Sequence, residues 1–130
     1  MMKEQEIVIF LNKISLLLLE TEKTYKDYHD SGKIFKHAKI LKYQNTKLLH
    51  LLEHEIELLK DNQQVKAREL MEHLDVWSKN WDKEYREKNP QRNDIFYFHN
   101  SNNFPRKTVN SLMKYKIKLE NKVKTGSVQV

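Results

Sequence analysis

Residues 7–28, IVIFLNKISLLLLETEKTYKDY, decide the fold class of this sequence. Large side chains recur here at alternating steps of four and three residues, which is the spacing of neighbours on one face of an α-helix. We therefore expect a helix over residues 4–29 with that face buried. The face is formed by Ile7, Leu11, Ile14, Leu18, Thr21, Tyr25 and Tyr28, and it is widened by Phe10 and Leu17.

The same periodicity appears twice more along the chain. The second stripe consists of Ile34, Ala38, Leu41, Asn45, Leu48, Leu52, Ile56 and Leu59, and the third of Ala67, Leu70, Leu74, Trp77, Trp81 and Tyr85. The polar Asn45 is expected at the edge of its stripe, because asparagine is rarely buried. Trp77 and Trp81 either fill the core or belong to a binding surface, since tryptophan is favoured in both places.

Turn residues separate the three stripes. DSG at residues 30–32 stops the first helix, and Gly32 suits a left-handed turn. KDNQQ at residues 60–64 precedes the third helix, with Asp61 or Asn62 as its N-cap. KNP at residues 88–90 ends that helix, because the residue before a proline avoids the helical conformation. Helices of about 26 residues joined by short connections predict an up-down-up antiparallel arrangement.

A shorter fourth helix is expected near the C-terminus, with Thr108 as its cap. Its apolar positions are Val109, Leu112, Met113, Ile117 and Leu119. YKIKL at residues 115–119 also alternates like a strand, but the helical period extends over a longer stretch. The predicted fold is therefore an all-α antiparallel bundle of three long helices plus this fourth one. It forms a single domain over residues 1–124, with a loop at 89–107, and residues 125–130 are a disordered tail.

The composition indicates the compartment. The chain has no cysteine, so disulfides and thiolate metal sites are excluded, and a reducing cytoplasm suits it. The apolar stretch at residues 7–19 is interrupted by Asn12 and Lys13 and is shorter than the about 20 residues that a bilayer crossing needs. The residues before it, MMKEQE, are not basic as in a signal peptide. We therefore expect a cytoplasmic protein that does not contact membranes.

The positive charge of the chain lies in its last third. Residues 90–130 carry eight basic and two acidic side chains, a balance of +6, which equals the net charge of the whole chain. This part includes a loop rich in aromatic and asparagine side chains, RNDIFYFHNSNNFPRK, at residues 92–107. Binding residues often lie on loops that a rigid scaffold holds in place. The predicted partner-binding residues are Arg92, Phe96, Tyr97, Phe98, Phe104, Arg106, Lys107 and Lys114.

These residues predict a non-enzymatic interaction protein with an acidic protein partner. The alternative is a nucleic-acid-binding module, because basic side chains neutralise phosphates and aromatic rings stack on bases. Arg92, followed by the polar Asn93 and then by His99, resembles the arginine–polar–histidine motif of HEPN-family ribonucleases, which are small helical proteins. The resemblance implies that Arg92 and His99 act together at an RNA phosphate. A homodimer through the stripes of the first two helices also stays open.

Histidines raise the question of a metal site. His50 and His54 are one helical turn apart, as in a two-histidine metal grip. On the helical wheel, however, they lie opposite the leucines of their stripe and face solvent. We therefore expect no metal and no cofactor.

Overall fold

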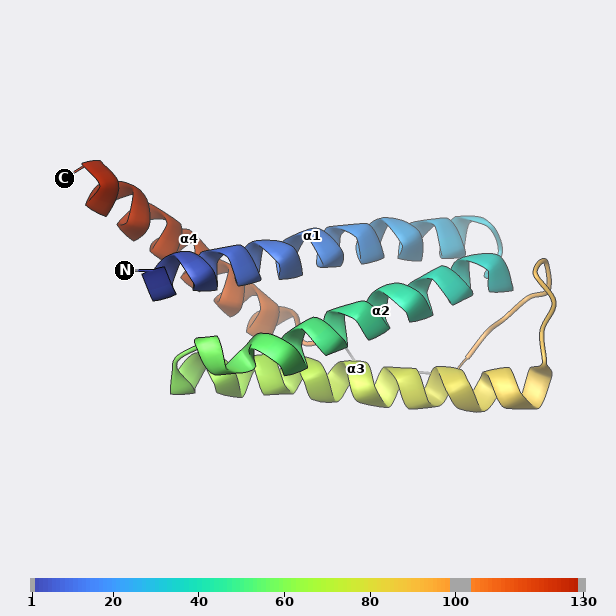
Figure 1. The fold of residues 1–130 in the computed structure, drawn as a ribbon. Coiled ribbons are helices and arrows are strands. Elements are labelled where there is room, and N and C mark those ends of the chain that lie inside the picture. Colours follow the sequence, from blue (N-terminus) through green and yellow to red (C-terminus); the bar gives the residue numbers. More distant parts are fainter. Residues whose placement is uncertain (1, 99–103, 129–130) are drawn as a thin grey trace.

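The computed structural model describes residues 2–98 and 104–128, and the side chains of 3–98 and 104–124 within them. The helices are α1 (Met2–Asp30), α2 (Phe35–Glu55), α3 (Asp61–Lys88) and α4 (Arg106–Val128), and a short 3₁₀ turn, η1 (Ile56–Leu58), continues α2. Figure 1 shows α2 running back along α1, α3 running back along α2, and α4 crossing α1 at an angle. The predicted all-α class is confirmed.

The four helices form a bundle in which each helix contacts two others. α2 packs against α1 on one side and α3 on the other, so the three helices form a layer. α4 packs against both α1 and α3 and closes this layer on one side. Figure 1 shows that α4 covers the end that contains the start of α1, while residues 89–98 turn around the opposite end.

Buried side chains form two clusters along this layer. The larger one lies where α4 closes the layer and includes Phe10, Leu11, Leu48, Leu70 and Leu119. The second lies at the opposite end and is largely aromatic, with members Tyr28, Phe35, Ala38, Leu41, Trp77, Trp81 and Phe96. One end of the core is thus completed by a helix and the other by a non-helical segment.

The predicted stripe of α1 is buried at both ends and is wrong at Tyr25. Ile7, Leu11, Ile14 and Tyr28 are buried, but Tyr25 is 51% exposed and Thr24 is buried in its place. α4 reaches α1 near its start, through Lys122 on Glu4 and Lys116 on Asn12. Tyr25 lies several turns beyond these contacts, so α1 buries a narrower face there.

The stripes of α2 and α3 are mostly buried as predicted. Asn45 is 7% exposed and lies within the core, so the expectation that it sits at the edge is wrong. Trp77 and Trp81 are core residues, at 7% and 5% exposed, whereas Tyr85 is 42% exposed. Because these stripes fill the chain's own core, the stripes of α1 and α2 are not available for pairing with another copy.

The connection from α1 to α2 follows the predicted turn. α1 ends at Asp30, and both Gly32 (φ 84°) and Lys33 (φ 64°) adopt left-handed backbone conformations. A left-handed residue is favourable for glycine and unusual for lysine. The contacts of the Lys33 backbone, described below, hold this conformation in place.

Two predicted caps are wrong. α3 begins at Asp61, and the N-cap residue is Lys60, which makes no side-chain capping bond. α4 begins at Arg106, so Thr108 lies inside its first turn. The Pro105 carbonyl accepts the hydrogen bond of Val109 N–H at 3.0 Å, which starts the helical pattern before Thr108. Proline is tolerated at the start of a helix, because an amide N–H at that position would have no partner within the helix.

The C-terminal segment is helical, and the strand alternative for residues 115–119 is wrong. α4 continues to Val128, past the expected boundary at residue 124, while residues 129 and 130 lie outside the described part. Within residues 2–98 and 104–128, no helix combines the length and the apolar character that crossing a bilayer requires.

Candidate functional site

Residues 89–98, which precede the fourth helix, form a clip over the open end of the α1–α2–α3 layer. The backbone N–H groups of Phe35 and Lys36, in the first turn of α2, donate to the carbonyls of Asp94 (2.8 Å) and Arg92 (2.9 Å). The N-cap residue Ile34 makes no side-chain capping bond. The first N–H groups of a helix have no partner within the helix. The clip supplies those partners from a segment distant in sequence.

The clip is also bonded to the chain before α2. The Phe96 N–H donates to the Lys33 carbonyl at 2.7 Å, and Ile34 and Ile95 form an isolated antiparallel β-bridge. The Tyr28 hydroxyl on α1 donates to the Phe96 carbonyl. Residues 33–36 and 92–96 therefore hold each other in place, which accounts for the left-handed backbone of Lys33.

Phe96 is the central side chain of the clip. It is fully buried, at 0% exposed. Its ring centroid lies 5.3 Å from that of Phe35 and 5.1 Å from that of Trp81. The prediction that Phe96 binds a partner is therefore wrong for this conformation, because its ring belongs to the core. Aromatic side chains bury a large apolar area, which outweighs the entropy cost of ordering the clip.

On either side of residues 99–103, Phe98 and residues 104–111 lie along one face of α3; we name residues 104–111 the return segment. The Phe98 ring lies 5.3 Å from the Trp77 ring, and the Phe104 ring 5.4 Å from the His73 ring, both edge to face. Further along, Thr108 Oγ1 donates to Glu69 Oε2 at 2.5 Å, and Lys66 Nζ donates to Ser111 Oγ at 2.5 Å. The residues of α3 that make these contacts are Lys66, Glu69, His73 and Trp77, and Trp81, which contacts Phe96, continues the row. They follow one another at steps of about one turn. The loop aromatics thus serve first to attach this return segment to α3.

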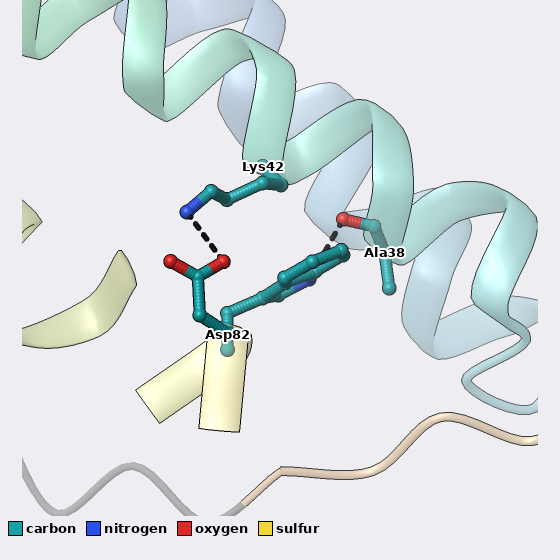
Figure 2. Close-up of polar contacts among 4 residues, drawn as sticks. Ala38, Lys42 and Asp82 are labelled. Carbon is teal, nitrogen blue, oxygen red and sulfur yellow. Dashed lines mark hydrogen bonds and ion pairs between the residues drawn. The ribbon is translucent and has the colours of Figure 1, made fainter. Parts of the chain in front are cut away.

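Polar contacts connect α2 with the aromatic end of α3. Trp81 Nε1–H donates to the Ala38 carbonyl at 3.1 Å, which satisfies a buried indole. Figure 2 shows Lys42 of α2 reaching Asp82 of α3, and their Nζ–Oδ1 distance is 2.9 Å. The Lys42 ammonium also lies 5.5 Å from the Trp81 ring centroid. These contacts join α2 to the aromatic end of α3.

The outer side of the clip is a small exposed surface. Ile95 is 71% exposed, Tyr97 is 50% exposed, and Arg92 is exposed as well. Lys33 Nζ lies 4.7 Å from the Tyr97 ring centroid, and Lys88 Nζ donates to the Tyr97 carbonyl at 2.6 Å. Tyr97 is therefore held in a defined position by two lysines.

The outer face of α4 is the second exposed surface and is strongly basic. Arg106, Lys107, Lys114 and Lys118 are all exposed. On the helical wheel, Lys107, Lys114 and Lys118 share one face, and Arg106 lies at its edge. Two other lysines of α4 have partners: the half-buried Lys116 contacts Asn12 and Glu120, and the exposed Lys122 pairs with Glu4. We name Arg106, Lys107, Lys114 and Lys118 the basic face.

The predicted binding residues therefore fall into three groups. Phe96 is core, and Phe98 and Phe104 pack on α3, although Phe104 keeps 40% of its surface exposed. Arg92 and Tyr97 belong to the clip, whereas Arg106, Lys107 and Lys114 belong to the basic face. Figure 1 shows the clip at the far end of α3 and α4 nearer the other end. The single surface expected from the sequence is in fact two.

Arg92 and the two histidines of α2 that the sequence singled out, His50 and His54, are exposed. Residues 89–98 are not helical, and the Arg92 side chain is exposed. His99 lies outside the described residues, so the HEPN-like pairing of Arg92 with His99 stays a prediction. His50 and His54 are both exposed, on the side of α2 that the helical wheel indicated.

Two structural roles were missed by sequence reasoning. Tyr28 was recognised only as a stripe residue, yet its hydroxyl holds the clip. α2 is capped by the main-chain carbonyls of Arg92 and Asp94, and no side-chain pattern in the sequence reveals such a contact. The only indirect signal was Ile34 at the N-cap position, which lacks the polar side chain that usually begins a helix.

Tyr28 should make stability depend on pH in alkaline solution. Burial, with smaller contributions from the neighbouring Tyr25 and Tyr97, raises its pKa to about 12. A folded-state pKa above the unfolded value of 10.0 stabilises the fold fully below pH 10 and progressively less as pH rises toward 12. At 1.36 kcal/mol per pKa unit, the loss approaches about 2–3 kcal/mol.

Urea unfolding measured across this pH range tests the effect. We expect Tyr28→Phe to show a shallower alkaline decline than the wild type. Tyr43→Phe, at an exposed tyrosine, is the matched control and should keep the wild-type decline. Equal slopes in all three proteins would contradict the assignment to Tyr28.

Comparisons of the chain with models of protein families, with curated proteins and with solved structures gave no match.

Proposed function

We propose that this chain is a non-enzymatic interaction protein that binds an acidic protein partner on the basic face of α4. The observation that carries the proposal is the separation of charge on that helix. Lys116 and Lys122 are paired within the chain, whereas none of the basic-face residues forms an ion pair among the described residues. Unpaired, exposed cations on a rigid helix attract acidic partners and speed their association.

The spacing of the basic face suits a folded or helical partner. Lys107 and Lys114 are two turns apart, and Lys118 follows after one more turn, so the cations extend over about 17 Å of helix. Ile117, 54% exposed, lies beside this row and adds an apolar contact. An acidic helix with carboxylates at similar turn spacing would match both features.

A nucleic-acid partner is the less favoured alternative. Binding of unpaired bases uses exposed aromatic rings as stacking platforms. Phe96 is fully buried and Phe98 packs on Trp77, so both are directed into the protein. Among the Phe and Tyr rings of the loop, Tyr97 and Phe104 remain exposed; Tyr97 lies on the clip, and Phe104, next to the basic face, packs edge to face on His73.

A charge-reversal experiment tests the proposal. In the variant Lys107→Glu/Lys114→Glu/Lys118→Glu we expect the affinity for a fluorescent acidic amphipathic peptide to fall at least about tenfold. The loss should be largest at low salt, because screening weakens charge attraction between exposed groups. The melting temperature should change little, since exposed charges contribute little to stability. Binding is measured by fluorescence anisotropy.

A matched control separates the basic face from general positive charge. Lys36, Lys39 and Lys47 are exposed on the outer side of α2, and reversing them changes the net charge by the same amount. This control should bind the peptide within about threefold of wild type. Equal losses in both triple variants would contradict the proposal. Tighter binding of a single-stranded oligonucleotide, lost only in the α4 variant, would favour the nucleic-acid alternative instead.

A further inference from the structure

The outward side of α1 carries an exposed apolar row that the core does not use. Ile9 is 55% exposed, Leu16 is 61% exposed and Leu19 is 60% exposed. Ile9, Leu16, Leu19 and the exposed Lys23 follow one another at steps of seven, three and four residues, which places them on one face beside the buried one. We name Ile9, Leu16 and Leu19 the outer seam of α1.

The charged residues beside the outer seam are placed so that they match the same residues of a second copy. Lys13 and Glu20 are exposed, and both lie on the same side of the seam, one before Leu16 and the other after it. Neither forms an ion pair among the described residues. They stand at equal distances from a point between residues 16 and 17.

We propose that the outer seam of α1 pairs with the same seam of a second copy, antiparallel, about a two-fold axis beside Leu16. A two-fold interface places the same patch on both subunits. With the axis between residues 16 and 17, Lys13 of each copy lies opposite Glu20 of the other. Leu16 meets its own counterpart, and Leu19 packs beside it. Both ion pairs and the apolar contact arise from a single symmetry operation.

A second copy provides both the apolar contact and the opposite charges that match this surface. An unrelated partner would need an apolar centre with a cation and a carboxylate in the reverse order, which this chain itself provides. The surface is small: a standard stable interface buries about 800 Å² on each partner, more than three side chains supply. The dimer is therefore weak and depends on concentration. The outer seam shares no residue with the basic face of α4, so the pairing does not rest on the function proposed above.

Sedimentation equilibrium of the full chain over a range of concentrations tests the proposal. We expect wild type to dimerise, and Lys13→Glu alone or Glu20→Lys alone to weaken dimerisation about tenfold, because each places like charges opposite one another twice. The double variant Lys13→Glu/Glu20→Lys restores the opposite charges and should recover the dimer. A wild-type protein that stays monomeric at every concentration would overturn the proposal, as would a double variant without recovery.

Cysteine cross-linking locates the axis. Because the chain has no cysteine, single-cysteine variants report on one position each. Leu16→Cys should form a disulfide-linked dimer under mild oxidation, since the two sulfur atoms would meet at the axis. Ile95→Cys is the control at an equally exposed apolar residue on the clip and should remain monomeric. Cross-linking at residue 95 but not at 16 would overturn the proposed interface.

Discussion

Replacing Phe96 with alanine is expected to lower the free energy of unfolding by about 3–5 kcal/mol, the cost of removing a fully buried phenylalanine. The ring lies between Phe35 and Trp81 in the aromatic cluster, where no solvent reaches it. Its loss leaves a cavity and removes the apolar contact that holds the clip. For a chain of this size the melting temperature should fall by at least about 10 °C, measured by circular dichroism.

A neighbouring aromatic provides the control for this prediction. Tyr97→Ala removes a half-exposed ring from the same segment and should cost less than about 1 kcal/mol, mainly the contact with Lys33. If Phe96→Ala were no more destabilising than Tyr97→Ala, residues 89–98 would be a surface loop and not part of the core. Faster amide exchange at Phe35 and Lys36 in Phe96→Ala would show that α2 loses its cap as the clip opens.

Replacing Leu112 with alanine is expected to cost about 2–5 kcal/mol. Leu112 is 1% exposed and belongs to α4, the helix that closes the layer between α1 and α3. A cavity at this position weakens the packing of α4 on both neighbours. Guanidinium unfolding should give a lower midpoint with an unchanged slope, because the same surface is exposed on unfolding.

Ile117→Ala is the matched control on the same helix. Ile117 is 54% exposed, so truncating it leaves no cavity, and alanine has the higher helix propensity. The stability of Ile117→Ala should stay within about 0.5 kcal/mol of wild type. A loss at Leu112 as small as that at Ile117 would mean that α4 does not pack on the layer as described.

Long periodic stretches of the sequence predicted the helices well. The stripes of α2 and α3 are buried at nearly every position, because a regular apolar row has one favourable solution against a neighbouring helix. Individual positions failed where the neighbours of a helix change along its length. Tyr25 is exposed since α4 reaches α1 only near its start. A helical wheel contains no information about where a distant helix ends.

The composition of the sequence predicted one candidate binding surface, but the structure places its residues on two separate surfaces and in the core. Basic and aromatic side chains alternate between residues 92 and 118, so the sequence suggested one mixed surface. The structure separates them by chemistry: Phe96 is buried, Phe98 and Phe104 pack on α3, and the lysines of α4 remain outside. Burying an aromatic ring stabilises the fold, whereas burying an unpaired ammonium would cost far more than it gains.

The sequence by itself determined the helical class, the approximate positions of α1, α2, α3 and α4, and the position of the positive charge; α4, expected to be the shorter helix, is longer than α2. These follow from local periodicity and composition, which act within a few turns of chain. Only the tertiary structure decided that residues 89–98 cap α2 and complete its core, and that the outer seam of α1 stays exposed. The physical reason is that main-chain capping and the burial of Phe96 depend on groups about 60 residues apart meeting in space, at Phe35 and at Asp94.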